Sequence, residues 1–241
     1  VVVFPGSNCD RDTLRAIELA GAEATALWHE QTDLDGCAAI VVPGGFAYGD
    51  YLRAGVIARF SPVMRSVAAF AAAGGLVLGI CNGFQVLAEA GLVPGALLRN
   101  RSLRFVCREV AIRAERPDSP FSAAVPEGAV LRMPVAHGEG CYYADEPTLD
   151  SMERDGRLLF RYVRSDGTVA AAAADRANPN GSLRGIAGVA NGAGNVAGLM
   201  PHPERAAEGV LGSTDGLLIL RSLVESAARR AAAARPVEVG R

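Results

Sequence analysis

Residues 75–87 constrain the fold most, because they predict a strand that turns sharply into a helix. Residues 76–80 form a short apolar run typical of a buried strand, and apolar residues then recur at helical spacing. Cys81 lies at the join, with Gly79 two residues before it and Gly83 two residues after it. This pattern is typical of a nucleophile elbow, in which a reactive side chain sits on a tight turn at the sheet edge.

The position of Cys81 favours a reactive thiol. A helix N-terminus stabilises a thiolate, and glycine suits a tight turn that leaves little room for side chains. The alternative is that Cys81 is a small buried hydrophobic residue, as free cysteines often are. The paired glycines favour the reactive role.

Composition limits the class of protein. The chain has 241 residues, half of them hydrophobic, and a net charge of −2. We expect one domain over residues 1–241 with a large core, and a frayed tail after about residue 230. No segment resembles a signal peptide or a membrane span. The five cysteines are irregularly spaced without a CxxC pair, so we expect reduced thiols in the cytoplasm and no metal site.

Lysine is absent from the sequence, so all 24 basic residues are arginine. A P-loop requires its lysine, and pyridoxal phosphate chemistry requires a lysine amine. We therefore expect neither activity, and no cofactor, in this chain. The near-neutral charge also argues against a nucleic-acid partner.

Strand and helix patterns alternate up to about residue 90. Apolar strands are predicted at residues 1–4, 22–28, 38–42 and 76–80, and helices at about 10–20 and 57–73. This alternation predicts an α/β fold with a doubly wound, mostly parallel sheet and helices on both faces. Shorter punctuated runs between residues 91 and 200 predict added antiparallel strands, and a final helix is predicted over residues 217–233.

The loop at residues 43–53 follows the predicted strand at 38–42 and begins with Pro43, Gly44 and Gly45. Backbone N–H groups in such a glycine pair can form an oxyanion hole, although a tight loop without a ligand is the alternative. Ser7 or Asn8 could either cap the first helix or contact a substrate.

A nucleophilic cysteine needs a base, and the chain has three histidines, at positions 29, 137 and 202. His202 follows an apolar strand at residues 196–199, and Pro203 favours an extended backbone at His202. Residues i and i+2 of an extended segment point the same way, so Glu204 can orient the imidazole. His137 lies in a glycine-flanked loop that could approach a ligand, whereas His29 has no comparable partner.

The pattern Gly79-x-Cys81-x-Gly83-x-Gln85, followed by His202-x-Glu204, resembles that of class I glutamine amidotransferases. Residues 4–10, 43–53, 81–85, 136–140, 178–182 and 200–206 are similar to the glutaminase-subunit family of phosphoribosylformylglycinamidine synthases, of purine biosynthesis. Ala47 stands where the resemblance predicts Ser, and the family's N-terminal Met and first residues are absent. Neither departure affects the Cys-His-Glu set.

The resemblance implies a role for each site residue. Cys81 would attack glutamine, His202 would act as the base and Glu204 would orient it. The backbone N–H groups of Gly45 and Asn82 would hold the oxyanion, and the glutamine contacts would come from Gln85, His137, Gly138 and Glu139. Ammonia would pass to a large synthetase subunit that uses ATP and Mg²⁺ to convert formylglycinamide ribonucleotide, accompanied by a small accessory subunit.

Two other functions stay open. One is a cysteine peptidase or hydrolase on a related doubly wound sheet, since one fold can carry several chemistries. The other is a catalytically silent interaction subunit, against which the intact Cys81, His202 and Glu204 set argues.

Overall fold

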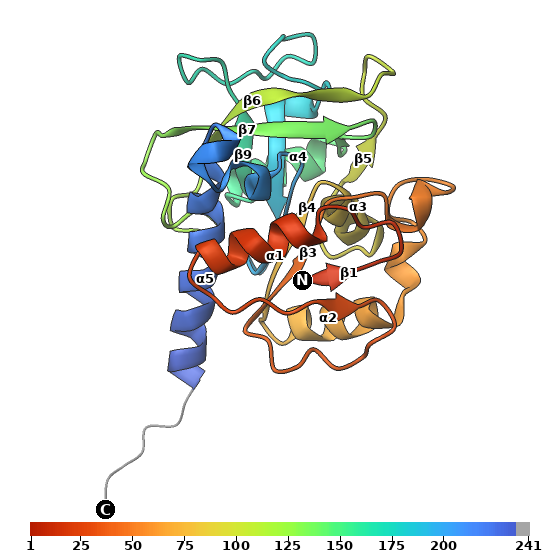
Figure 1. Cartoon of the computed structure of the whole chain (residues 1–241). Coiled ribbons are helices and arrows are strands. Elements are labelled where there is room, and N and C mark those ends of the chain that lie inside the picture. The colour runs from red at the N-terminus through yellow and green to blue at the C-terminus, as the bar shows by residue number, and fades with distance from the viewer. Residues whose placement is uncertain (235–241) are drawn as a thin grey trace, which may run out of the picture.

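A seven-stranded mixed sheet forms the centre of the protein, in a computed structural model that describes residues 1–234 (Figure 1). In spatial order the strands are β3 (Ala39–Val42), β4 (Leu76–Ile80), β11 (Val196–Leu199), β10 (Ile186–Ala190), β9 (Leu158–Tyr162), β6 (Val106–Ala114) and β7 (Val130–His137). The first three are parallel, and every later pairing is antiparallel. The predicted α/β class is confirmed, with a larger antiparallel part than the expected mostly parallel sheet.

Two short sheets flank the central one. The strand β1 (Val2–Val3) pairs in parallel with β2 (Leu27–Trp28), and β5 (Ala96–Leu98) pairs antiparallel with β8 (Cys141–Tyr143). The strand predicted over residues 22–28 is therefore wrong in extent, because β1 offers only two residues for pairing.

Five α-helices lie among the described residues: α1 (Asp10–Leu19), α2 (Pro62–Ala72), α3 (Asn82–Glu89), α4 (Glu146–Arg154) and α5 (Asp215–Ala234). The short 3₁₀ segments are η1 (Ala47–Asp50), η2 (Ala58–Phe60), η3 (Leu183–Gly185), η4 (Pro203–Ala206) and η5 (Gly209–Leu211). No helix within residues 1–234 is long and apolar enough to cross a membrane.

Three helix predictions need correction. The helix expected over residues 57–73 is split into η2 and α2, since Pro62 fits only the first turn of a helix. Neither Ser7 nor Asn8 caps α1, whose N-cap is Cys9 without a side-chain bond. Helix α5 runs from Asp215 to Ala234, slightly longer than the predicted 217–233, and most of the tail predicted after about residue 230 lies outside the described residues.

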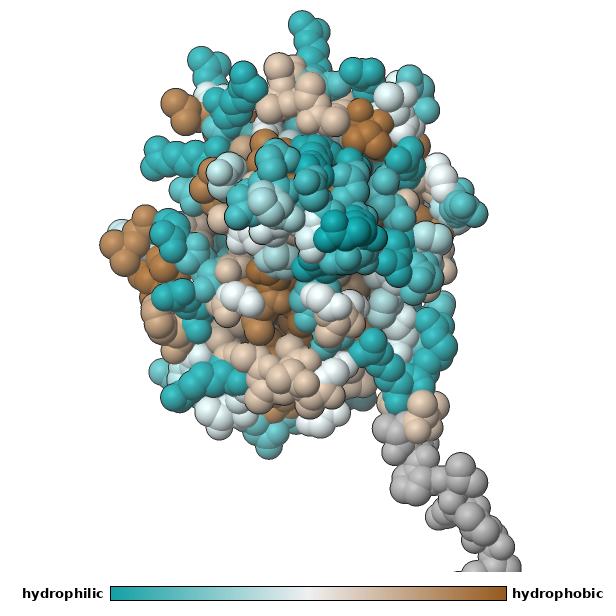
Figure 2. Space-filling view, turned by 180° about the vertical axis from the view of Figure 1, so that it is seen from behind, coloured by the Kyte–Doolittle hydropathy of each residue, from teal (hydrophilic) through white to brown (hydrophobic). Residues whose placement is uncertain are grey.

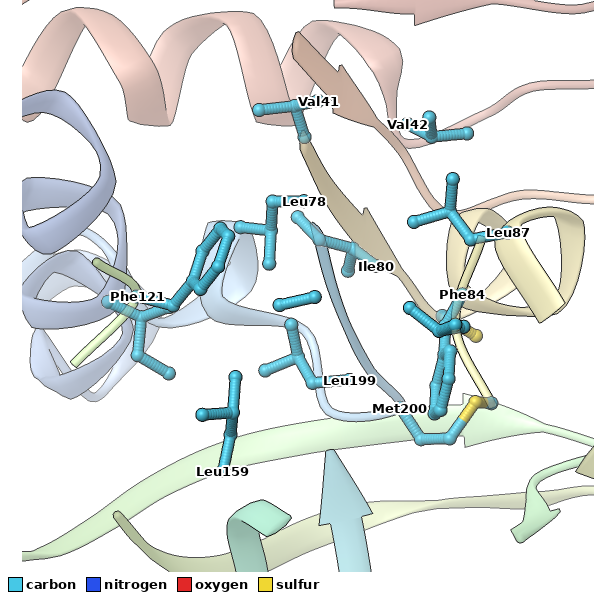
Figure 3. Close-up of a cluster of buried hydrophobic side chains, with 14 of the residues drawn as sticks. Val41, Val42, Leu78, Ile80, Phe84, Leu87, Phe121, Leu159, Leu199 and Met200 are labelled. Atoms are coloured by element: carbon cyan, nitrogen blue, oxygen red, sulfur yellow. The ribbon is translucent and has the colours of Figure 1, made fainter. Parts of the chain in front are cut away.

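The core between α3 and the parallel strands fixes the helix that follows Cys81 (Figure 3). Phe84 and Leu87 of α3 are fully buried. A Cβ at Gly198 of β11 would lie 2.1 Å from the Phe84 ring, so only glycine admits the ring there. Burial of a phenylalanine side chain contributes roughly 1.5–3 kcal/mol, which anchors the helix start beside the sheet edge.

The β6–β7 pair crosses above the ends of the parallel strands, as Figure 1 shows. The His202 N–H donates to the Pro134 carbonyl of β7 at 2.9 Å. The Cys81 sulfur lies 3.6 Å from the Ala136 carbonyl of the same strand. The sheet therefore curls so that β7, its last strand in spatial order, covers the residues that follow β4 and β11.

Candidate active site

Cys81 occupies a strained turn between β4 and α3, as the elbow pattern predicts. Its φ and ψ are 48° and −105°, a conformation that non-glycine residues rarely adopt. A Cβ at Gly83 would lie 1.9 Å from the Val42 carbonyl oxygen, and a Cβ at Gly79 would lie 2.7 Å from the Gly83 carbonyl oxygen. Both glycines are required because the backbone of the turn packs directly against β3 and α3.

His202 and Glu204 form a buried pair at the end of β11, the strand beside β4. The distance between His202 Nδ1 and Glu204 Oε1 is 2.5 Å, and both residues are almost fully buried. The predicted extended segment is wrong beyond His202, because Pro203 begins the 3₁₀ segment η4. The carboxylate nevertheless reaches the imidazole as predicted.

The electrostatics of this pair suit proton transfer. Burial opposes a charge on the imidazole, but the carboxylate of Glu204 and then the sulfur of Cys81 raise the pKa of His202 well above its ordinary value. Nε2 of His202 is buried and makes no hydrogen bond within the described residues. With Nδ1 held by Glu204, Nε2 is the nitrogen left to exchange a proton with Cys81.

A second buried thiol, Cys9, lies beside the pair. Its sulfur accepts a hydrogen bond from Arg205 Nη2 at 3.0 Å, and Arg205 Nε lies 3.9 Å from Glu204 Oε1. The ligand atoms of Cys9, His202 and Glu204 lie within 4.8 Å of one another. The Arg205 guanidinium lies beside the Cys9 sulfur. Hydrogen bonds therefore account for the cluster of Cys9, His202 and Glu204. The sequence assigned Cys9 no role, although it lies in the stretch 4–10 that carries the resemblance.

The candidate oxyanion donors are available. No hydrogen bond of residues 1–234 uses the backbone N–H of Gly45 or of Asn82. The Asn82 side chain holds the loop that contains Gly45, because its Oδ1 accepts from the Ala47 N–H at 2.9 Å. Ala47 makes this contact through its backbone, so the contact does not require the Ser that the resemblance predicts at that position.

A pocket of about 180 Å³ opens beside Cys81. Its lining residues come from the loop after β3, from α3 and from β7 with its following loop: Gly45, Phe46, Asp50, Ala54, Cys81, Gln85, Phe105, Ala136, His137, Gly138 and Glu139. Phe46 and Phe105 stack with ring centroids 6.5 Å apart. Such a pocket suits a small ligand whose reacting atom lies next to the sulfur.

Gln85 shapes this pocket through its amide. Its Nε2 donates to the Glu139 carbonyl at 2.6 Å, and its Oε1 accepts from Asn82 Nδ2 at 2.9 Å. Gln85 thereby ties α3 to the loop at Gly138 and Glu139. Its amide is engaged by the protein, which makes it a support for the pocket wall.

His137 also lines the pocket, but both of its ring nitrogens face other side chains. Nδ1 lies 3.1 Å from Asn100 Oδ1, and Nε2 lies 3.4 Å from Asn180 Nδ2. Burial, reinforced by the charge of His202, lowers the pKa of His137 to about 4. The structure places a neutral ring in the pocket wall at His137. His29 instead lies 2.8 Å from the Tyr48 hydroxyl, which also contacts Ser61.

Comparison with known proteins identifies a family for this chain. A family model described as a CobB/CobQ-like glutamine amidotransferase domain matches residues 1–215. The chain belongs to this glutamine amidotransferase family. The family resemblance stated from the sequence is thereby confirmed.

Relatives within the family are highly similar over nearly the whole chain. The phosphoribosylformylglycinamidine synthase subunit PurQ of Gloeobacter violaceus is 57% identical, with 94% of this chain and 97% of the relative covered. The protein of that name from Salinibacter ruber is 56% identical, with 93% and 94% covered. A chain in the structure of PurLQS from Thermotoga maritima is 42% identical, with a TM-score of 0.80 and 93% and 95% covered.

A more distant structure shares the fold of this amidotransferase. The glutaminase domain of Trypanosoma brucei CTPS has a TM-score of 0.60 at 14% identity, with 95% of this chain and 93% of that chain covered. At that identity only the α/β architecture is compared.

Proposed function

We propose that this chain is the glutaminase subunit of a phosphoribosylformylglycinamidine synthase, and that it hydrolyses glutamine to glutamate and ammonia. One observation carries the proposal: Cys81 on its strained elbow lies beside a buried His202–Glu204 pair at the end of the neighbouring strand. The names of the relatives at 56–57% identity support the choice of synthase.

The reaction begins when the Cys81 sulfur attacks the side-chain amide carbon of glutamine. His202 takes the thiol proton at Nε2 and gives it to the departing amine, so that ammonia leaves as the carbon–nitrogen bond breaks. Glu204 holds the imidazole through Nδ1. The unused N–H groups of Gly45 and Asn82 stabilise the negative oxygen of the tetrahedral intermediate.

The second half-reaction releases glutamate. Water attacks the γ-glutamyl thioester, His202 accepts the proton of the water, and the sulfur leaves as the carbon–sulfur bond breaks. His137, Gly138 and Glu139 form the wall against which the glutamine lies. Gln85 holds that wall in place.

Ammonia is consumed by a separate, ATP- and Mg²⁺-dependent synthetase subunit, and this chain needs no cofactor of its own. The absence of lysine, and with it of a P-loop, supports this division. The Thermotoga maritima structure is of PurLQS, which supports assembly with a large and a small subunit. A cytoplasmic location is part of the proposal and is supported by five free cysteines.

The protein surface beside the pocket suits such a partner. A hydrophobic patch lies at the left edge of Figure 2, where the segment between β3 and α2 protrudes. The segment between β3 and α2 includes the exposed apolar side chains of Leu52 and Phe60. Exposed apolar patches commonly mark protein–protein contacts.

The test is a glutaminase assay on the purified chain, alone and assembled with its synthetase. We expect glutamate release that rises on assembly and disappears in Cys81→Ala. The Cys81→Ala complex should still form product from added ammonium salt. Loss of both activities in an intact complex would contradict the division of labour, and peptide cleavage without glutaminase activity would favour the peptidase alternative.

A further inference from the structure

The pocket beside Cys81 carries an unbalanced negative charge. Among its described lining residues two are carboxylates, Asp50 and Glu139, and none is an arginine. Apart from the two carboxylates and Cys81, the titratable side chain in this lining is His137, which its burial keeps neutral. A ligand that fits this pocket therefore gains from a positive charge.

Asp50 is the less compensated of the two carboxylates. Glu139 has Arg99 at its rim, with Nε 3.8 Å from Oε1, although Arg99 is largely exposed. Asp50 forms no ion pair within residues 1–234, and its Oδ1 accepts one hydrogen bond, from Asn82 Nδ2 at 3.0 Å. Burial raises the pKa of Asp50 to about 6. The hydrogen bond from Asn82 opposes this increase, and the charge of Glu139 adds to it.

The backbone around Asp50 is held in a strained conformation. Tyr48, Asp50 and Leu52 have φ values of 55°, 53° and 69°. Such strain persists only where the surroundings over-determine the conformation, and it concentrates at ligand-binding sites. The Tyr48 hydroxyl fixes the loop through His29 and Ser61.

Asp50 is also connected to the oxyanion donors. The Asn82 side chain contacts Asp50 through Nδ2 and the Ala47 N–H through Oδ1, and both contacts lie in the loop that contains Gly45. The backbone N–H of the same Asn82 is a candidate oxyanion donor. A group bound at Asp50 therefore lies against the loop that supplies Gly45 and against the residue that supplies the second donor.

We propose that Asp50, with Glu139, binds the α-ammonium group of glutamine and is the residue that selects an α-amino acid amide over an amide without that group. The inference rests on the proposed function, which places the side-chain amide of glutamine at Cys81. The free carboxylate of the ligand is then directed away from Asp50 by like-charge repulsion.

The test compares L-glutamine with glutaramate, which has hydrogen in place of the α-amino group, on the complete complex. Asp50→Asn keeps the side-chain shape and an oxygen for Asn82 but removes the charge. The ratio of kcat/KM for glutamine to that for glutaramate should fall roughly 10- to 100-fold, as expected when a hydrogen bond to a charged group is lost. The matched control is Asp145→Asn, because Asp145 caps α4 outside the pocket and asparagine caps equally well.

A labelling experiment distinguishes recognition of the ligand's α-ammonium charge from a general effect on the geometry of the site. A chloroketone analogue of glutamine carries the α-ammonium group, whereas iodoacetamide does not. Asp50→Asn should slow alkylation of Cys81 by the chloroketone roughly tenfold or more and leave its alkylation by iodoacetamide unchanged. The exposed thiol of Cys107 serves as an internal reference for both reagents.

Two results would overturn the proposal. Equal losses with both substrates, or equal slowing of both reagents, would make Asp50 a structural residue. Unchanged discrimination would place the ammonium group elsewhere. In either case glutamate release by the wild-type complex leaves the proposed function intact. If the wild-type complex releases no glutamate, the proposed function fails, and labelling of Cys81 still decides whether Asp50 recognises an ammonium group.

Discussion

The ends of β11 and β7 each present a buried histidine near Cys81, yet the two regions differ in charge. After β11, His202 is paired with the carboxylate of Glu204, and its pKa is raised despite burial. At the end of β7, His137 lies between the amides of Asn100 and Asn180, and burial lowers its pKa to about 4. Burial is the same in both places, so the partner on the ring decides which histidine can carry a proton.

The comparison also separates two tasks within one site. The segment after β11 belongs to the parallel half of the sheet, which supplies the reacting groups. The segment after β7 belongs to the antiparallel half, which covers those groups and forms the pocket wall. A neutral ring at His137 suits the wall, because a second charge there would oppose the imidazolium that forms at His202.

The largest expected effect is on catalysis at His202. His202→Ala should lower kcat for glutamine hydrolysis by roughly 10⁴-fold or more, since removal of a triad base has such an effect. Single-turnover formation of the thioester is the direct measurement. A comparable loss in His137→Ala with an intact fold, and near-normal turnover in His202→Ala, would exchange the roles of the two regions.

The next effect is on stability in acid. A pKa near 4 for folded His137, against about 6.5 when unfolded, means that the unfolded state binds more protons between these values. This contribution to the free energy of unfolding is complete above pH 6.5 and falls as the pH drops toward 4, by at most about 3 kcal/mol. Urea unfolding of the wild type and of His137→Asn across this range should show a steeper acid loss in the wild type. Parallel curves would contradict the lowered pKa.

The smallest expected effect is that of His137→Asn at neutral pH. The change leaves the buried amides of Asn100 and Asn180 with poorer partners, which costs about 1–3 kcal/mol. For a chain of this size, each kcal/mol lowers Tm by about 2–4 °C. The glutamine KM should rise while kcat stays close to that of the wild type. A Tm equal to the wild-type value would show that the amides do not depend on the ring.

The sequence predicts the reacting groups well because their signals are local. The glycines around Cys81 and the His202-Pro-Glu204 stretch describe a turn and a pair within a few residues, and the structure has both. The roles of Gln85 and His137 could not be read in this way, since their partners come from loops far along the chain. Asp50 was not identified from the sequence, because what distinguishes it is that no positively charged side chain of residues 1–234 pairs with it, and only the assembled pocket reveals this.

The curl of the sheet could not be predicted from the sequence either. Alternating runs predict antiparallel strands but do not state which sheet edge they cover. The contact of His202 with Pro134, and that of Cys81 with Ala136, depend on β7 returning across the parallel strands. No local pattern in the β7 sequence encodes that path.

The central claim is that Cys81 forms a covalent intermediate that His202 helps to make. The most direct measurement is intact-mass and peptide mass spectrometry of the full chain, quenched in acid during turnover of glutamine. We predict a γ-glutamyl adduct on Cys81 in the wild type, no adduct in Cys81→Ala, and a strongly slowed adduct in His202→Ala. Glutamate release by the wild type without any adduct on Cys81, or with an adduct on Cys9 or the exposed Cys107 instead, would contradict the account.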